Sequence, residues 1–293
     1  MHCDSSAFVA WATGCVVERG PMRIDKPENG VASYGTENDG LGKPDGQALV
    51  SLGDGGNAVL TFDSPIYNGP GPDFAVFENP LENAQQPGFF FLELGFVEVS
   101  SDGVNYFRFP SVSNVPTDTQ ISSFGCVEPH LVHNFAGKYA PLYGTPFDLD
   151  ELPDDIMLDK NNVTHVRIVD VVGTIDPEYA TYDSEGHMVN DPWPTPFASS
   201  GFDLDAVGVI HDLNHHSVNE TSTRILTIFP NPVRDFLSVK AENVTSLTVW
   251  SLSGQQLLKA ESNRIDLSML PSGLYLVRMV TDGKTFVDKF VKN

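Results

Sequence analysis

Acidic side chains beside short apolar stretches are the part of this sequence best suited to chemistry. Asp203 and Asp205 lie two positions apart in an apolar stretch, and side chains two apart on a strand point to the same face of a sheet. Asp73 and Glu78 bracket another apolar stretch, after a loop rich in Gly and Pro. Carboxylates on one face repel each other unless a cation neutralises them, and Ca²⁺ takes roughly six to eight such oxygen ligands. We therefore predict a calcium site, with Asp170 as a reserve ligand, built from Asp73, Glu78, Asp203 and Asp205.

The same acidic residues allow two other interpretations. One is a set of solvated acidic faces and turn-forming aspartates. The other is glycoside hydrolysis by a pair of carboxyl groups, whose separation only the folded chain reveals; the candidates are Glu78, Glu93 and Glu98. The sequence contains no Gly-x-Ser-x-Gly motif, and Cys126 has no catalytic Cys–His signature around it. Nucleophilic catalysis therefore has no support, and a non-catalytic site is favoured.

Aromatic residues in a long connection are the candidates for ligand contact. Residues 173–200 show no strand pattern, and long ordered loops are often functional. Tyr179, Tyr182 and Trp193 of this loop could stack on sugar rings, while neighbouring Asp and Asn side chains accept hydrogen bonds from hydroxyl groups. Alternatively, these rings fix the loop to the body of the protein. A glycan is the ligand class that the composition favours.

Histidine and cysteine residues give weaker signals. His211 and His215 have the spacing of two zinc ligands on a helix, but the segment around them is polar and lacks a helical period, so we interpret it as a solvated spacer. Cys3 and Cys15 could pair in an oxidising compartment and leave Cys126 free, or all three could be unpaired.

The elements that position these residues are predicted to be strands. Short runs rich in β-branched and aromatic residues are bounded by Gly, Pro, Asn or Asp, and no amphipathic helix of three turns is present. The fold class is therefore all-β, a sandwich with long loops. In the first two thirds of the chain the predicted strands are 57–62, 73–77, 89–100, 106–109, 164–172 and 204–210.

Charge and composition divide the chain into two domains. The net charge is −22, but residues 224–293 carry +3 and residues 1–223 carry −25. The segment 212–223 is polar and lacks periodicity, which is typical of a linker. Seven further strand signals follow it. We predict an acidic β-sandwich over 1–211, the linker 212–223, and a small seven-stranded, Ig-like sandwich over 224–293.

The last 70 residues resemble a known family. Residues 229–233 read FPNPV, a Leu-Thr-Val-Trp strand leads to Ser253-Gly254, and 270–278 read LPSGLYLVR. In this order the motifs resemble the C-terminal sorting domain (type A) of the type IX secretion system of Bacteroidetes. The resemblance implies export across the outer membrane by that machinery, followed by release or surface attachment. The positions that match the sorting motifs are Pro230, Asn231, Pro232, Gly273, Tyr275, Lys289 and Lys292.

The first domain carries a less informative resemblance. Residues 51–56 (SLGDGG), 73–79 (DFAVFEN) and 201–207 (GFDLDAV) are similar to an uncharacterised family of secreted bacterial cell-surface proteins over 15–211. A fold-level similarity to galactose-binding-like jelly rolls rests on the Ser-Asp-Gly turn that ends at Gly103 and on the Val-Arg-Ile run 166–168. That similarity implies glycan binding on loops and a structural Ca²⁺, without establishing either.

Composition excludes several function classes. The strongly negative charge disfavours nucleic acid and anionic membranes as partners. No apolar run reaches the length of a membrane span, and no signal-peptide pattern is visible near residue 1. The resulting hypothesis is a secreted or outer-membrane-surface protein with a non-enzymatic, calcium-stabilised module for binding, with glycan as the favoured ligand. The alternatives are a polysaccharide hydrolase with a Glu pair and a structural envelope protein without a small ligand.

Overall fold

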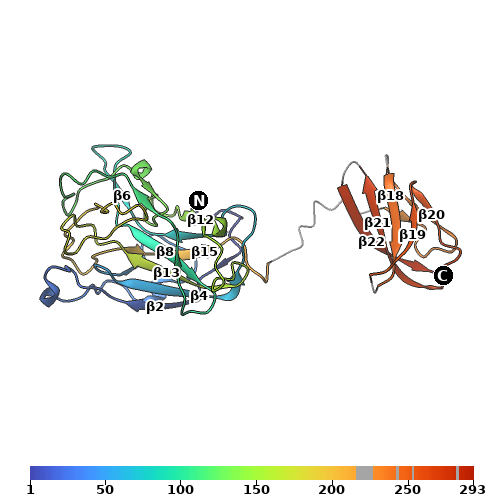
Figure 1. The fold of residues 1–293 in the computed structure, drawn as a ribbon, viewed down its shortest axis with the longest axis horizontal. Coiled ribbons are helices and arrows are strands. Elements are labelled where there is room, and N and C mark those ends of the chain that lie inside the picture. Colours follow the sequence, from blue (N-terminus) through green and yellow to red (C-terminus); the bar gives the residue numbers. More distant parts are fainter. Residues whose placement is uncertain (216–226, 242–243, 253, 282–283) are drawn as a thin grey trace. The chain divides into compact units, whose positions relative to one another are not determined.

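The computed structural model describes residues 1–215, 227–241, 244–252, 254–281 and 284–293. The chain forms two compact units, Met1–Ser217 and Val218–Asn293. Both are built from antiparallel strands, so the all-β class is confirmed (Figure 1). Among the described residues, helical structure is limited to four 3₁₀ turns at Pro27–Asn29, Glu37–Gly40, Pro129–Leu131 and Leu149–Glu151.

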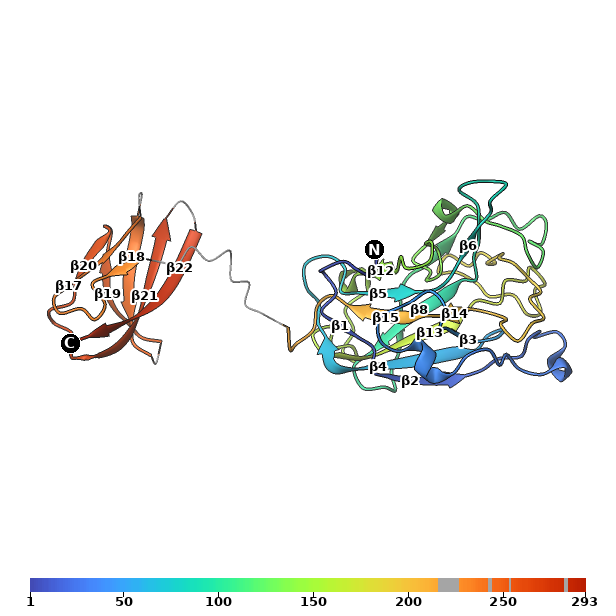
Figure 2. The same cartoon turned by 180° about the vertical axis from the view of Figure 1, so that it is seen from behind.

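Two sheets form the body of the first unit. The larger has the order β2-β4-β13-β8-β9 and the smaller has the order β1-β15-β5-β12. Apolar residues from both sheets, among them Leu60, Ile168 and Phe74, lie in one buried cluster, so the sheets pack as a sandwich. Figure 2 shows the same sheets from behind. Their strands are β1 (Ala10–Trp11), β2 (Gly14–Glu18), β4 (Asn57–Ile66), β5 (Phe74–Phe77), β8 (Gly95–Ser100), β9 (Phe107–Arg108), β12 (Thr145–Phe147), β13 (Val163–Asp170) and β15 (Ala206–Val209).

Three pairs of short antiparallel strands lie outside the two main sheets. They are β3 (Val50–Ser51) with β14 (Asp203–Leu204), β6 (Leu81–Glu82) with β7 (Phe90–Phe91), and β10 (Val112–Ser113) with β11 (Val132–His133). The predicted strand 89–100 is wrong as one element, because Leu92, Glu93 and Leu94 interrupt it between β7 and β8. All three residues are buried, and apolar composition alone could not distinguish this buried break from a continuous strand.

The end of the first unit extends past the predicted boundary. Asp212 bridges to Ile66, is 2% exposed, and the Leu213 N–H donates to the Pro65 carbonyl (3.1 Å). Residues 212–215 therefore belong to the sandwich, where their polar groups are hydrogen-bonded. Residues 216–223, the rest of the predicted linker, lie outside the described residues.

The second unit has seven strands within its described residues. They form sheets of order β16-β17-β20 and β19-β18-β21-β22 around a separate core that includes Leu237, Val249 and Phe290. The predicted number of strands agrees with the described residues. The strands are β16 (Ile228–Phe229), β17 (Phe236–Val239), β18 (Val244–Trp250), β19 (Gln256–Ala260), β20 (Arg264–Asp266), β21 (Gly273–Thr281) and β22 (Lys284–Lys292).

The motif that opens this unit is tied to its last strand. Asn231 accepts a hydrogen bond from the Val291 N–H (2.9 Å) and its amide donates to the Lys289 carbonyl (3.4 Å). Val233 exchanges backbone hydrogen bonds with residues 291 and 293. Asn231 therefore acts as a side-chain link between the start and the end of the unit.

Replacing Asn231 by Ala should weaken the second unit. The Asn231→Ala change removes two side-chain hydrogen bonds, and we expect it to lower the free energy of unfolding by about 1 kcal/mol. Urea unfolding of the full chain measures this change. Gln256→Ala, an exposed polar position on β19, is the matched control. Equal stability of the two variants would contradict the proposed link.

Candidate metal centre

Seven carboxylates gather where the strands and loops of the first unit bring their ends together. Six of them are at least 94% buried, and Asp203 is half-buried. They come from separate segments: the turn before β4, the end of β5, the break before β8, the end of β13, the loop 173–200, and the β14–β15 junction. We call this set the acidic cluster. Its members are Asp54, Glu78, Glu93, Asp170, Asp191, Asp203 and Asp205.

Alternation along the chain places Asp203 and Asp205. Phe202 and Leu204 are buried in the main core, so the residues between and after them point away from it. Ser51 on β3 donates its hydroxyl to Asp203, its register partner on β14, and the Gly46 N–H donates to Asp205 (3.1 Å). Both carboxylates act electrostatically on Glu78. Both aspartates therefore lie within electrostatic reach of one buried carboxylate.

Glu78 and Glu93 are the least satisfied members of the acidic cluster. One carboxylate oxygen of Glu78 has no hydrogen-bond partner. The Glu93 carboxylate accepts no hydrogen bond from the described residues. Burial raises the pKa of both groups well above its usual value, and the charge of Asp203 raises both further. Leaving a buried carboxylate without a partner costs the full desolvation of that group.

A small pocket adjoins Glu93. Its volume is about 10 Å³, room for one water-sized particle. Three further carboxylates of the acidic cluster line it: Asp54, Asp170 and Asp191. Burial also raises the pKa of each of them. The pocket therefore concentrates acidic oxygens around a space of ionic size.

Backbone N–H groups hold three of these carboxylates in place. Asp170 accepts from Phe202 (2.6 Å) and Gly55 (2.8 Å). Asp191 accepts from Leu94 (3.2 Å), and one Asp54 oxygen accepts from the Ile24 N–H and the Trp193 indole N–H, both at 2.9 Å. These bonds fix the positions of the carboxylates but supply no full positive charge.

No lysine or arginine neutralises the acidic cluster among the described residues. The ion pairs of the first unit lie elsewhere, as in Arg23–Asp25 (2.6 Å) and Lys43–Asp4 (2.5 Å). Arg23 lowers the pKa of Asp54, but this effect is smaller than that of burial. Protons or a bound cation must therefore balance the buried charge.

Asp73 does not belong to this site, and its grouping with Glu78 is a correction to the predicted set. The two residues flank β5 at opposite ends, roughly 16 Å apart at 3.3 Å per residue. Asp73 accepts from the N–H groups of Gly69 (2.7 Å) and Leu149 (2.8 Å) and contacts His211 Nδ1 (2.8 Å). Its polar contacts are complete, and it anchors two loops.

The spacer interpretation of the two histidines is also wrong. His211 pairs with buried Asp73, and His215 Nδ1 lies 2.9 Å from buried Asp212. Each ring is therefore tied to the first unit by a different carboxylate, and the two do not form a zinc pair.

Two residues of the pocket were missed from the sequence, and a third was assigned another role. The sequence motifs assign no ligand role to Asp54 or Asp191, and they place Glu93 only among the candidates for hydrolysis. Neighbouring glycines and prolines were the available signal for Asp54 and Asp191, because such residues let the backbone bring a carboxylate inward. Pairing of loops distant in sequence cannot be deduced from that signal.

A second group of possible ligands lies at the start of the chain. His2, Cys3 and Asp4 place one potential ligand atom each within 4.8 Å of the others. Asp4 is already paired with Lys43, and burial raises the pKa of the Cys3 thiol. Lys43 thus compensates the charge of Asp4 without a metal ion. The structure contains no disulfide at Cys3, Cys15 or Cys126, which are all unpaired.

Two arginines form ion pairs with Glu98, the third carboxylate considered for hydrolysis. Its oxygens lie 2.8 Å from Arg108 and 2.5 Å from Arg167, one oxygen to each guanidinium. These arginines stack over Phe96 and Tyr106. Glu98 is therefore part of a structural clamp between β8, β9 and β13.

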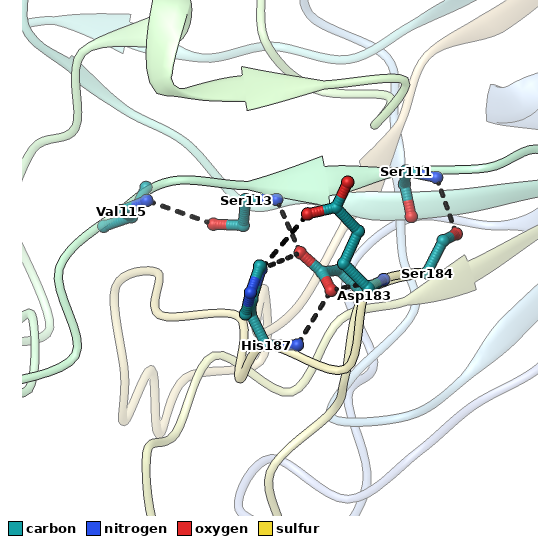
Figure 3. Close-up of polar contacts among 7 residues, drawn as sticks. Ser111, Ser113, Val115, Asp183, Ser184 and His187 are labelled. Atoms are coloured by element: carbon teal, nitrogen blue, oxygen red, sulfur yellow. Dashed lines mark hydrogen bonds and ion pairs between the residues drawn. The ribbon is translucent and has the colours of Figure 1, made fainter.

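The loop 173–200 is held by polar side chains, of which Asp183 is buried and Ser184 is exposed. Asp183 accepts from the N–H groups of Ser113 (2.9 Å), Glu185 (2.9 Å) and His187 (2.8 Å), and Ser184 accepts from Ser111 N–H (Figure 3). Burial would raise the pKa of Asp183, but these donors outweigh it and the net shift is downward. The loop is thereby fixed next to β10.

The three predicted ligand-contact aromatics lie on this loop in different settings. Tyr182 is 45% exposed, and Tyr179 is half-buried with its hydroxyl donating to Glu178 (3.0 Å). Trp193 is half-buried, its indole N–H is bound to Asp54, and the Arg23 guanidinium lies 5.4 Å from the centroid of its ring. Trp193 therefore connects the loop 173–200 to the pocket.

Comparison with known proteins identifies the second unit. Residues 227–293 match the family described as the secretion system C-terminal sorting domain, which confirms the resemblance found in the motifs. None of the curated proteins compared with the chain is similar to it in sequence. Among the described residues no helix is long and apolar enough to cross a membrane.

One solved structure matches the chain over most of its length. Ruminococcus gnavus beta-glucuronidase is 10% identical over 94% of this chain and 45% of its own length, with a TM-score of 0.19. The chain thus spans less than half of that enzyme. A similarity at this level supports no statement about fold or activity, and the jelly-roll topology stays a prediction.

The acidic cluster predicts an unusual pH dependence of the stability of the first unit when EDTA removes metal ions. Burial raises the pKa of Asp203 to about 7 and that of Asp205 to about 6. The folded state then keeps protons that unfolded aspartates, with a pKa near ~3.9, have lost. Stability must fall as the pH rises from 5 to 8. In EDTA, calorimetry should show the first unit melting about 5 °C lower at pH 8 than at pH 5.

The variant Asp203→Asn is the control for this effect. It removes the group whose pKa burial raises further, and it should flatten the pH dependence in EDTA. An increase in melting temperature between pH 5 and pH 8 would show that the carboxylates are compensated in another way.

Proposed function

We propose that this chain is a type IX secretion cargo whose first unit is a non-enzymatic, calcium-stabilised module that binds glycans. The second unit indicates export to the cell surface or the medium. The observation that supports the calcium site is the gathering of six buried carboxylates and the half-buried Asp203, with no basic partner among the described residues.

The second unit supports the export role through its own architecture. It has a separate core and a basic balance, whereas the excess of acid lies in the first unit. The positions that match the sorting motifs gather around the last two strands: Gly273 pairs with Lys292, and Leu276 pairs with Lys289. Tyr275 stacks on Phe290 with ring centroids 5.8 Å apart, and its hydroxyl donates to the Pro271 carbonyl (2.9 Å). Lys289 is exposed, so it is available to the secretion machinery, whereas Lys292 is 8% exposed and its ammonium donates to Asn293.

A bound cation accounts for the acidic cluster better than ordinary hydrogen bonding. One buried oxygen of Glu78 has no partner, the Glu93 carboxylate accepts no hydrogen bond from the described residues, and neighbouring carboxylates repel both groups. Ca²⁺ is the natural counter-ion for a site that offers only oxygen ligands. Glu78, Asp170, Asp203 and Asp205 of the predicted set all belong to this cluster.

Burial argues against the hydrolase alternative. Glu78 is 4% and Glu93 6% exposed, and the pocket beside Glu93 has room for a water-sized particle but not a sugar. Glu98 is occupied by two arginines. A glycosidase needs both carboxyl groups in contact with the glycosidic bond. These residues are better suited to holding an ion than to attacking a polysaccharide.

Exposed rings support a glycan as the ligand. Tyr182 is exposed on the loop 173–200, and Phe197 of the same loop stacks on Phe124 with centroids 5.6 Å apart. Both phenylalanines are exposed, at 42% and 76%. Exposed aromatic faces with neighbouring polar groups favour the apolar faces of sugar rings.

Removing the second unit should abolish export. In a bacterium with a type IX system, we expect the chain truncated before residue 227 to accumulate inside the outer membrane, because the sorting domain is missing. Immunoblots of medium, surface and periplasmic fractions measure the distribution. The full chain with Gln256→Ala is the control, and normal export of the truncated chain would refute the assignment of the tail as the address.

Binding without turnover is the expected behaviour of the first unit. On a glycan array, the full chain should bind at least one polysaccharide class in Ca²⁺, and Tyr182→Ala should weaken that binding by about 1–3 kcal/mol if its ring stacks on a sugar. Reducing-end release that is lost in Glu93→Gln would instead indicate a hydrolase. An array without binding and an assay without turnover would favour the structural envelope protein.

A further inference from the structure

We propose that a calcium ion occupies the pocket beside Glu93, held by Asp54, Glu93, Asp170 and Asp191, and that this ion fixes the loop 173–200 to the sandwich. This inference rests on the calcium stabilisation proposed above and specifies where the ion lies and what it does. It differs from the set predicted from the sequence, of which only Asp170 is retained.

Glu93 supplies the first argument. It is 94% buried, lines the pocket, and accepts no hydrogen bond from the described residues. Its carboxylate lies within electrostatic reach of both Asp170 and Asp191. A buried carboxylate without a donor, beside a space of ionic size, is an unfilled ligand position. The 10 Å³ of this space matches one ion or one water.

Gly173 supplies the second argument, because it makes room for a carboxylate of the pocket. A second glycine, Gly201, is already required by its positive φ and by the Gly53 backbone. A Cβ added at Gly173 would lie 1.5 Å from an oxygen of Asp191, and a Cβ at Gly201 would lie 2.7 Å from an oxygen of Asp170. Both glycines line the pocket. Gly173 is not among the glycines with positive φ, so its backbone does not require Gly. Space for Asp191 is therefore the specific reason for Gly at this position.

The chemistry of the lining selects the ion. Carboxylates, the Thr195 side chain and backbone groups offer oxygen, and neither histidine nor cysteine lines the pocket. Oxygen-only sites favour Ca²⁺ or Mg²⁺ over zinc and copper. Mg²⁺ usually keeps several of its waters, and this pocket has room for little beyond the ion. Ca²⁺ is therefore the better match.

The position of the pocket in the fold gives the ion its role. Asp54 and Asp170 belong to the sandwich, while Asp191, Trp193 and Thr195 belong to the loop 173–200. The indole of Trp193 already bonds Asp54 across this junction. An ion between Asp170 and Asp191 replaces their repulsion with attraction, so it fastens the near end of the loop that carries the predicted glycan-contact aromatics.

Titration calorimetry on the full chain tests the site. Protein stripped with EDTA is titrated with CaCl₂, and MgCl₂ is the comparison. We expect one calcium site, weakened about 10- to 100-fold by Asp191→Asn and by Gly173→Ala, which keeps every charge but displaces Asp191. Asp73→Asn, which alters a buried carboxylate at the other end of β5, should leave the affinity unchanged. The melting curve of each variant in EDTA confirms that it is folded.

Hydrogen exchange measured by mass spectrometry tests the role of the ion. Calcium should slow exchange in peptides of the loop 173–200 in the parent chain and not in Gly173→Ala. Asp183→Asn, which loosens the loop at its other anchor, should speed exchange there while the calcium affinity stays unchanged. Unaltered exchange in the parent chain on calcium addition would overturn the role of the ion in holding the loop.

The outcomes separate this inference from the proposed function. If Glu78→Gln abolishes calcium binding while Asp191→Asn and Gly173→Ala do not, the ion lies nearer β14, and the pocket assignment is overturned while calcium stabilisation stands. If the parent chain binds no calcium, both are overturned. Loss of binding in Asp191→Asn and Gly173→Ala, with Glu78→Gln unaffected, supports the site.

Discussion

Burying carboxylates without basic partners is the constraint on which the first unit depends. Moving an ionised carboxylate out of water costs several kcal/mol, and neighbouring carboxylates increase that cost. The sandwich nevertheless places Glu78, Glu93 and Asp170 at strand ends where the main core meets the loops, because Phe202, Leu204 and Ile168 around them pack inward. Backbone N–H groups orient several of the carboxylates but leave the charge unbalanced. Either protons or a bound cation can balance this buried charge. A bound cation would keep the unit stable at neutral pH.

The same constraint distinguishes the first unit from the second. The excess of negative charge lies in the first unit, where we propose that a cation balances it beside the loop 173–200. The second unit has few buried charges and builds its core from strands that Asn231 links to β22. The Glu98 clamp shows that the first unit can also bury a carboxylate with arginines where no ion is needed.

Local pattern was sufficient for much of the architecture. The seven strands of the second unit follow from turn residues and short apolar runs, and the alternation from Phe202 to Asp205 agrees with the burial of Phe202 and Leu204 in the main core. The same local reasoning failed for Asp73, because two residues that bracket a strand in sequence lie at its opposite ends in space. It failed again at Leu92–Leu94, since a buried break and a buried strand share the same apolar composition. Asp54 and Asp191 could not be found together because their meeting depends on how distant loops pack, which no periodicity records.

The most direct test of the account is a crystal structure of the full chain grown in CaCl₂, with an anomalous difference map at a wavelength where calcium scatters. The account predicts a peak in the pocket, about 2.3–2.6 Å from a carboxylate oxygen of Glu93 and from oxygens of the neighbouring aspartates. A map with no anomalous peak there, and with Glu93 hydrogen-bonded to water or to another carboxyl group, would contradict it.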